Sequence, residues 1–211
     1  MTTPQVRWRR AAGTPQAERP PLLVLLHGRG ADEHDLFELA PAIDPRFAIA
    51  SVRGPLEAEG GHTWFESRSP GRPVPESLRA SVDDLGGWLA SLQGDRVARQ
   101  RIVLMGFSAG MMMAAALLLD RPEAYAGGIL LSGALPFESG LPVVDDRLHG
   151  VPVFYGHGSF DRVIPADLVA RTQTYLRKNS GARLTPNAYP IAHEIGAAEM
   201  RDIAVWLEGV A

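Results

Sequence analysis

The sequence predicts an α/β fold in which a mostly parallel sheet is covered by helices on both faces. Candidate strands and candidate helices alternate along the chain, which is typical of this class. Residues 22–26 are apolar at every position, as expected of a strand that is buried on both faces. A second apolar run, at 101–105, leads directly into Gly-Phe-Ser-Ala-Gly. The length of 211 residues suits one domain, so a single domain is expected over residues 1–211.

The elements expected in the first half of the chain, in order, are a short polar strand at 5–10, a strand at 22–26, a helix at 32–43, a strand at 47–52 and a helix at 76–92. Pro41 and Pro45 favour an end to the first helix. Leucine and valine recur at helical spacing in the second helix. A Gly-Thr-Pro turn at 13–15 separates the first two strands, and the glycine- and proline-rich residues 54–75 predict a long loop.

The elements expected in the second half are a strand at 101–105, a helix at 111–119, strands at 128–131 and 151–155, a helix at 165–178, a strand at 183–189 and a helix at 194–207. The run of methionine, alanine and leucine at 111–119 consists of strong helix formers, and Pro122 fits its end. We interpret its methionines as core packing. Residues 133–150 are expected to form a loop.

Composition excludes several classes of partner. The net charge is −3 and no basic block is present, which argues against a nucleic-acid partner. No apolar stretch approaches the roughly 20 residues of a membrane span, so stable membrane insertion is not expected. The first residues show no pattern of a secretory signal. The chain has no cysteine, hence no disulfide, thiolate nucleophile or cysteine metal site. A cytoplasmic location is therefore expected.

Residues 106–110 form a Gly-x-Ser-x-Gly motif between a predicted strand and a predicted helix. A serine hydroxyl is a weak nucleophile, and a sharp strand-to-helix turn lifts it clear of the sheet. The flanking glycines let the strand and the helix approach each other closely. This arrangement is the nucleophile elbow of α/β-hydrolases, and it predicts Ser108 as the nucleophile.

A serine nucleophile requires a base and an acid, which follow it in the chain order of α/β-hydrolases. His193 is the histidine that lies beyond the later strands, and we predict it as the base. Asp161 follows the strand at 151–155 and is the predicted acid, whereas Asp145 and Asp146 precede that strand and Asp167 lies inside the next helix. Two alternatives stay open: His193 as an ordinary loop histidine, and Asp161 as a helix cap.

The oxyanion of the reaction requires backbone donors. We predict the N–H of Ala109, directly after the serine, and that of Arg29 in the loop after the strand at 22–26. The alternative for this His-Gly loop is simple turn chemistry. Trp64, Phe65 and Phe137 are candidates for lining an apolar acyl pocket, with core packing as the alternative, favoured for Phe137.

Six motifs in order resemble the phospholipase/carboxylesterase family, which includes acyl-protein thioesterases and small bacterial carboxylesterases. They are residues 25–35, Arg53-Gly54-Pro55, Trp64-Phe65, residues 106–110, residues 156–165 and Tyr189 with His193-Glu194. The resemblance covers the chain from about residue 20 onward. It implies a compact α/β-hydrolase without a large cap domain, and it requires no cofactor.

The resemblance also implies roles for individual residues. It assigns Ser108, Asp161 and His193 as a catalytic triad and the amides of Arg29 and Ala109 as oxyanion donors, and it places Trp64 near the substrate. Homodimers are common in the family, so a homodimer stays open here.

Four positions depart from the thioesterase branch of the family. That branch usually has Gln in place of Ala109 and an apolar residue in place of Arg29; Met111 and Ala192 stand where small residues or glycine are common. We therefore expect a carboxylesterase that hydrolyses short- to medium-chain esters of small molecules through an acyl-enzyme.

Other activities fit the sequence less well. Thioesters and lysophospholipids are the alternative substrates, and a non-catalytic ligand-binding protein of the same fold is a further alternative. A dienelactone-hydrolase-like enzyme usually needs a cysteine nucleophile, which this chain lacks. His27, Asp32 and His34 have no established ligand spacing, so no metal site is expected.

Overall fold

The computed structural model describes residues 3–12, 20–92 and 101–210, and these residues form a seven-stranded central sheet with the order β1-β3-β2-β8-β9-β10-β11. The strands are β1 (Val6–Arg9), β2 (Leu22–Leu26), β3 (Ala48–Val52), β8 (Ile102–Phe107), β9 (Gly127–Leu131), β10 (Pro152–Gly158) and β11 (Arg183–Tyr189). The edge strand β1 pairs antiparallel with β3, and the other neighbours pair parallel. The predicted, mostly parallel sheet is confirmed.

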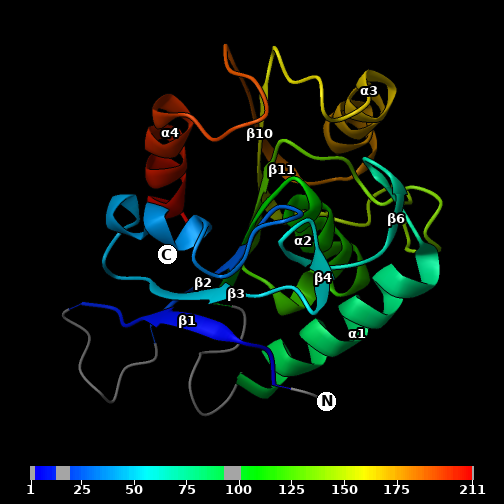
Figure 1. Cartoon of the computed structure of the whole chain (residues 1–211). Helices are drawn as coiled ribbons and strands as arrows, with labels where there is room; N and C mark the ends of the chain where they lie inside the picture. Colours follow the sequence, from blue (N-terminus) through cyan, green and yellow to red (C-terminus); the bar gives the residue numbers. More distant parts are fainter. Residues whose placement is uncertain (1–2, 13–19, 93–100, 211) are drawn as a thin grey trace.

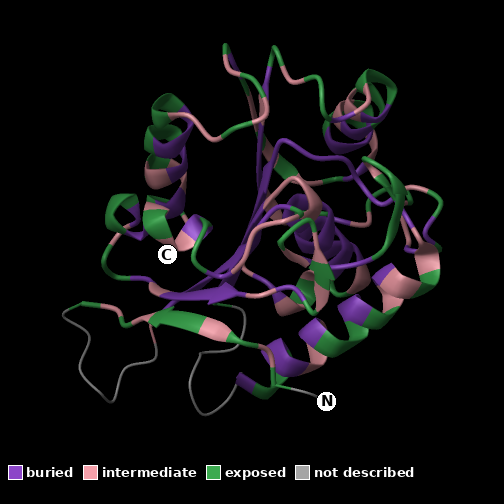
Figure 2. Cartoon of the chain, in the orientation of Figure 1, coloured by how far each residue is buried: buried purple, intermediate pink, exposed green. Residues whose placement is uncertain are grey.

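Helices cover both faces of this sheet (Figure 1). One face carries α1 (Pro75–Leu92), α2 (Ala109–Asp120) and α3 (Ala166–Thr174), and the other carries the 3₁₀ helix η1 (Leu36–Ala42) and α4 (Ala197–Glu208). Successive residues of β2 point to opposite layers, since Val24 belongs to the core that includes α2, whereas Leu23 belongs to the core that includes η1 and α4. Figure 2 shows the central strands buried along their length. The described residues hold no large cap domain.

Two short helical turns complete the described helices: the 3₁₀ turn η2 (Pro122–Ala124) and the π-helical turn η3 (Tyr175–Asn179), which continues α3. The helix expected at 165–178 thus divides into an α and a π segment. None of the described helices combines the length and the apolar character that a membrane crossing needs. The turn expected at 13–15 lies outside the described residues.

The helix expected at 32–43 is shorter than predicted and is a 3₁₀ helix. The residues at its expected start make other contacts: Ala31, directly before it, forms an isolated bridge with His62, and the Asp32 carboxylate accepts the His34 N–H at 2.8 Å. Pro41 lies inside the helix and has no N–H to donate. These contacts favour a short, tight helix over a regular α-helix.

The prediction of a long loop at 54–75 was wrong, because the segment contains two small hairpins. In the first, β4 (Leu56–Ala58) pairs with β5 (Gly61–Thr63), and in the second, β6 (Ser67–Ser69) pairs with β7 (Arg72–Pro73). The first turn consists of Glu59 and Gly60, both with positive φ (53° and 85°), as a tight two-residue hairpin turn of the I′ type requires.

Candidate active site

Ser108 lies at the turn between β8 and α2, with φ 56° and ψ −116°. Such a backbone conformation is unfavourable for a residue other than glycine, by about 1–3 kcal/mol. Its N–H donates to the Leu131 carbonyl on the neighbouring strand at 3.0 Å, and its carbonyl accepts the Met112 N–H in α2 at 3.2 Å. A Cβ on Gly106 would overlap the carbonyl of Gly110, so the sharp turn requires the glycines that flank the serine.

The three residues of the predicted triad form one continuous chain of hydrogen bonds. The Nε2 atom of His193 lies 2.9 Å from the Ser108 Oγ, and its Nδ1 lies 2.8 Å from an Asp161 carboxylate oxygen. Because an ionised carboxylate can only accept, Nδ1 carries the proton and Nε2 is free to accept the serine hydroxyl. The side chains of Asp161 and His193 are 5% and 18% exposed. The arrangement can therefore remove a proton from the serine.

The Asp161 carboxylate is held by its own loop. Its Oδ1 atom accepts the N–H groups of Val163 at 2.8 Å and of Ile164 at 3.3 Å, which leaves Oδ2 for the histidine. These two bonds fix the orientation of the carboxylate after β10. The predicted acid is thus held in place by its own loop.

The loop after β10 and the loop after β11 are also bonded to each other. The Ser159 N–H donates to the Tyr189 carbonyl at 2.7 Å, and the Phe160 N–H donates to the Ile191 carbonyl at 3.0 Å. The Phe107 ring packs against the imidazole of the second loop, with 4.8 Å between the ring centres. These contacts fix the separation of the predicted acid from the predicted base.

The two predicted oxyanion donors lie beside the serine. Arg29 and Ala109 both line the cavity at Ser108. Among the residues that the structure describes, no acceptor receives a hydrogen bond from either amide. The preceding loop residue, Gly28, passes so close that a Cβ added there would lie 3.5 Å from the Ser108 Cβ. Both amides are thus available to an oxygen atom at this place.

A cavity of about 480 Å³ opens at Ser108 and His193. Apolar side chains form most of its wall; they are Phe65, Pro70, Phe107, Met112, Ala134, Val163 and Ile164. One ion pair lines it as well, with 2.8 Å between the Arg29 Nε and a Glu59 carboxylate oxygen, both partly exposed. The second hairpin contributes Ser67 and Ser69. The site is therefore a mostly apolar cavity whose wall also includes an ion pair and two serines.

The three aromatic candidates lie in different places. Phe65 lines the cavity, but Trp64 is only 1% exposed and lies outside its wall, where its Nε1–H donates to the His27 carbonyl at 2.8 Å. Phe137 packs under the Arg171 guanidinium, 4.0 Å from the ring centre, and does not line this cavity. Of the three, only Phe65 is placed to contact a substrate.

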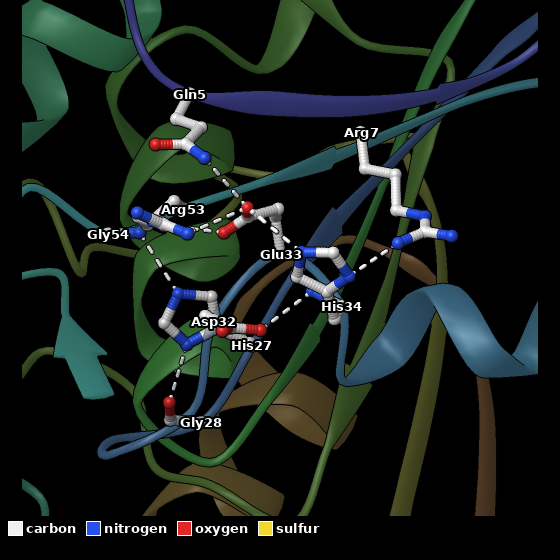
Figure 3. A network of polar contacts seen from close by, with 9 residues as sticks. All are labelled: Gln5, Arg7, His27, Gly28, Asp32, Glu33, His34, Arg53 and Gly54. Carbon is white, nitrogen blue, oxygen red and sulfur yellow. Dashed lines mark hydrogen bonds and ion pairs between the residues drawn. The ribbon is translucent and has the colours of Figure 1, made fainter. Parts of the chain in front are cut away.

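A network of polar side chains lies beneath the loop after β2 (Figure 3). At its centre the buried Glu33 accepts two hydrogen bonds from Arg53, at 2.5 and 2.8 Å, and one from Gln5 at 3.1 Å. Burial raises the pKa of Glu33, but the hydrogen bond from Arg53, a backbone hydrogen bond and the nearby charges of Arg53 and His34 together outweigh burial and leave that pKa below its ordinary value. This network ties β1 and β3 to the loop.

The network also bears on the candidate metal ligands. Asp32, Glu33 and His34 offer ligand atoms within 4.8 Å of one another, but the Glu33 oxygens are already used by Arg53 and Gln5. His27 does not belong to this group of ligand atoms, and both of its ring nitrogens are hydrogen-bonded to the backbone. These contacts are typical of a structural hydrogen-bond network, in which the Glu33 oxygens are already hydrogen-bonded, and not of ligand atoms that are free to bind a metal ion.

Sequence reasoning missed several residues of the cavity wall. Met112 packs in the core and also faces the cavity, and its position four residues after Ser108 was the signal that both lie on one side of α2. Val163 and Ile164 follow Asp161 in the same loop, which was a usable signal as well. Glu59 had no such signal, because the hairpin that carries it was not predicted.

Comparison with known proteins gives a consistent result. The model of the phospholipase/carboxylesterase family matches residues 11–210. A putative hydrolase of Bacillus subtilis, MhqD, is 29% identical over 186 residues, which is 88% of this chain and 91% of that protein. Acyl-protein thioesterase 1 of Debaryomyces hansenii is 24% identical over 166 residues, covering 74% and 72% of the two chains.

Solved structures agree with this result. A carboxylesterase of Bacillus cereus superposes with a TM-score of 0.85 at 25% identity, over 99% of this chain and 95% of that chain. A carboxylesterase of Mesorhizobium loti superposes with a TM-score of 0.80 at 26% identity, over 91% and 90%. The α/β-hydrolase fold predicted from the sequence is confirmed.

Proposed function

Since the chain belongs to the phospholipase/carboxylesterase family, we propose that it is a serine esterase that hydrolyses short- to medium-chain carboxylic esters through an acyl-enzyme. The observation that carries the proposal is the continuous chain of hydrogen bonds from Asp161 through His193 to Ser108 at an apolar cavity. The substrates are small-molecule esters, and we place the enzyme in the cytoplasm.

In the first step the Ser108 oxygen attacks the ester carbonyl while its proton passes to the His193 Nε2, which already lies 2.9 Å away. Asp161 holds the imidazole in the required tautomer and stabilises the imidazolium. The carbonyl oxygen becomes an oxyanion, which accepts hydrogen bonds from the amides of Arg29 and Ala109.

The tetrahedral intermediate then collapses. The bond between the carbonyl carbon and the alkoxy oxygen breaks, His193 gives its proton to the leaving alkoxide, and the acyl group stays on Ser108. His193 next takes a proton from a water molecule, whose oxygen attacks the acyl carbon. A second collapse releases the carboxylic acid and returns the proton to Ser108.

The wall of the cavity supports the proposed substrate class. Its apolar side chains favour an aliphatic or aryl acyl group, and a volume of about 480 Å³ suits a small ligand. The same steps would release a thiol from a thioester. Because some relatives are named acyl-protein thioesterases, thioesters are the alternative substrate that the experiment must include.

The test is steady-state hydrolysis of p-nitrophenyl esters from acetate to palmitate, together with acyl-coenzyme A thioesters of the same chain lengths. We expect the highest kcat/KM among the short and medium oxygen esters, and no turnover with Ser108→Ala. Ser91→Ala, a change on the exposed side of α1, is the matched control and should retain wild-type rates. Activity of Ser108→Ala equal to that of the control overturns the serine mechanism, and a preference for palmitate overturns the chain length.

A further inference from the structure

We infer that His27 is a positioning residue that aims the Arg29 N–H at the oxyanion. The inference rests on the proposed function, because it explains why the loop after β2, which carries the proposed oxyanion donor Arg29, has the geometry it has. His27 precedes this loop, is almost fully buried at 1% exposed, and lies outside the wall of the cavity. It acts through the backbone rather than on the substrate.

Both ring nitrogens of His27 are engaged with the backbone (Figure 3). The Nδ1 atom lies 2.6 Å from the Gly28 carbonyl oxygen, and the Nε2 atom lies 2.9 Å from the Gly54 amide nitrogen. A carbonyl can only accept and an amide N–H can only donate, so Nδ1 carries the proton and Nε2 carries none. The two contacts therefore select one neutral tautomer of the ring.

The planarity of the peptide group carries this constraint to the active site. In a trans peptide the Gly28 C=O and the Arg29 N–H belong to one plane and point in opposite directions. A hydrogen bond that draws the C=O toward His27 thus turns the N–H to the other side. Ser108 lies close to this loop, as the approach of Gly28 to it shows. The bond from His27 consequently favours an Arg29 N–H that faces the reacting oxygen.

Other contacts of the loop are weaker or act elsewhere. The Gly28 carbonyl also accepts the Ala31 N–H, but at 3.4 Å. The Gly30 N–H donates to the His62 carbonyl at 2.9 Å, which anchors the far end of the loop to β5. The short bond from His27 is therefore the principal contact that fixes the rotation of the Gly28–Arg29 peptide.

The surroundings keep the ring neutral. Burial lowers the pKa of His27 and outweighs the opposing effects of the Gly28 carbonyl and of the carboxylates of Asp35 and Asp32, while His62 lowers the pKa further. An imidazolium would direct an Nε2–H at the Gly54 N–H, so protonation would set two donors against each other.

Two substitutions separate the two contacts of the ring. The amide nitrogen of Asn occupies nearly the position of Nδ1, so His27→Asn retains a donor for the Gly28 carbonyl. The longer Gln side chain instead reaches the position of Nε2, so His27→Gln retains an acceptor for Gly54 and loses the bond to Gly28. His34→Gln is the matched control, because His34 belongs to the neighbouring network and is largely exposed.

Removal of one oxyanion donor lowers kcat by about 10²- to 10³-fold, and a donor that points in the wrong direction should lower kcat by a smaller factor. We expect kcat of His27→Gln to fall about 10- to 100-fold with KM changed by less than about threefold, since the interaction strengthens in the transition state. We expect His27→Asn to lie within about threefold of His34→Gln in kcat. Equal losses in His27→Asn and His27→Gln, or a loss in KM alone, would indicate a merely structural role.

A measurement on the wild-type protein covers the case in which a variant fails to fold. The ¹⁵N shifts of the His27 ring at pH 7 report its tautomer directly. We expect a protonated Nδ1 and an unprotonated Nε2. An Nε2–H tautomer or an imidazolium overturns the inference. If Ser108→Ala is inactive while His27→Gln matches His34→Gln, this inference fails and the proposed function stands; if Ser108→Ala is active, the proposed function itself fails.

Discussion

The α-carbon of Gly110 packs directly against the carbonyl oxygen of Leu26. A Cβ added to Gly110 would overlap that oxygen and lie 2.6 Å from the His27 carbonyl oxygen. The first turn of α2 therefore meets the end of β2 backbone to backbone. This contact fixes the distance between the serine and the loop that carries the proposed oxyanion donor.

Gly110→Ala should accordingly destabilise the protein and reduce turnover. The new methyl group must push α2 away from the loop, and overpacking of this kind costs about 1–3 kcal/mol. Gly86→Ala is the control: Gly86 lies in α1, where a Cβ would meet only Leu117, at 3.5 Å. In that helix the same change should stabilise the protein by about 0.5–1 kcal/mol. Urea unfolding and ester hydrolysis measure both effects, and equal stability of the two variants contradicts this account.

Asp161→Asn should lower kcat by about 10⁴, because an amide nitrogen can donate to Nδ1 and so favour the wrong tautomer of His193. The fold should persist, since the remaining amide oxygen still accepts from the loop. Asp167→Asn is the matched control: Asp167 lies nearby on the surface and pairs with Arg72 at 3.3 Å. Rates of Asp161→Asn close to those of Asp167→Asn would remove Asp161 from the mechanism.

Glu199 should make stability depend on pH. Its side chain is fully buried against β10, where a Cβ on Gly156 would overlap its Oε1. Burial raises its pKa to about 7, Asp202 acts in the same direction, and the Gly196 N–H opposes them. Below pH 4.5, the ordinary pKa, both states are protonated; between pH 4.5 and 7 the unfolded chain ionises first, so the free energy of unfolding falls as pH rises.

Between pH 4.5 and 7, the free energy of unfolding of the wild type should fall by about 3 kcal/mol relative to that of Glu199→Gln, because the Gln side chain cannot ionise. Urea unfolding at a series of pH values from acid to mildly alkaline measures it. At mildly alkaline pH, Glu199→Gln should be more stable than the wild type. Parallel pH profiles for the wild type and Glu199→Gln would show that the buried carboxyl does not have the raised pKa.

Narrowing the cavity should shift the preference among acyl chains. Ala134 is buried in the cavity wall, and Ala134→Leu extends a side chain into the space that a longer acyl group would fill. We expect kcat/KM for the hexanoate ester to fall by about tenfold while the acetate ester changes less than about threefold. A parallel decrease for both esters would place the acyl group elsewhere.

The sequence predicted the framework of the fold because its signals are local. The strand β2 has the predicted bounds because an uninterrupted apolar run defines it, and β11 has the predicted bounds as well. The hairpins within 54–75 were missed because the Glu59-Gly60 turn is not a strong hairpin signal and the paired residues show little alternation. The bridge of Ala31 to His62, which displaces the start of η1, is a tertiary contact that no local pattern contains.

The site was predictable to the extent that parallel strands share an edge. Ser108, Asp161 and His193 follow β8, β10 and β11, and the carboxyl ends of these strands meet, so their proximity follows from the topology. The direction of each side chain does not follow from it. Trp64 and Phe65 are neighbours in sequence, yet only Phe65 faces the cavity, because the Trp64 indole is drawn inward to a backbone carbonyl.

The central claim is that Ser108 is an activated nucleophile. It is tested most directly by labelling the folded protein with a fluorophosphonate probe and locating the adduct by mass spectrometry, with Ser108→Ala and Ser91→Ala as paired variants. We predict one adduct on Ser108 that persists in Ser91→Ala and disappears in Ser108→Ala. A folded wild-type protein that takes up no probe, or takes it up on another residue, would contradict the account.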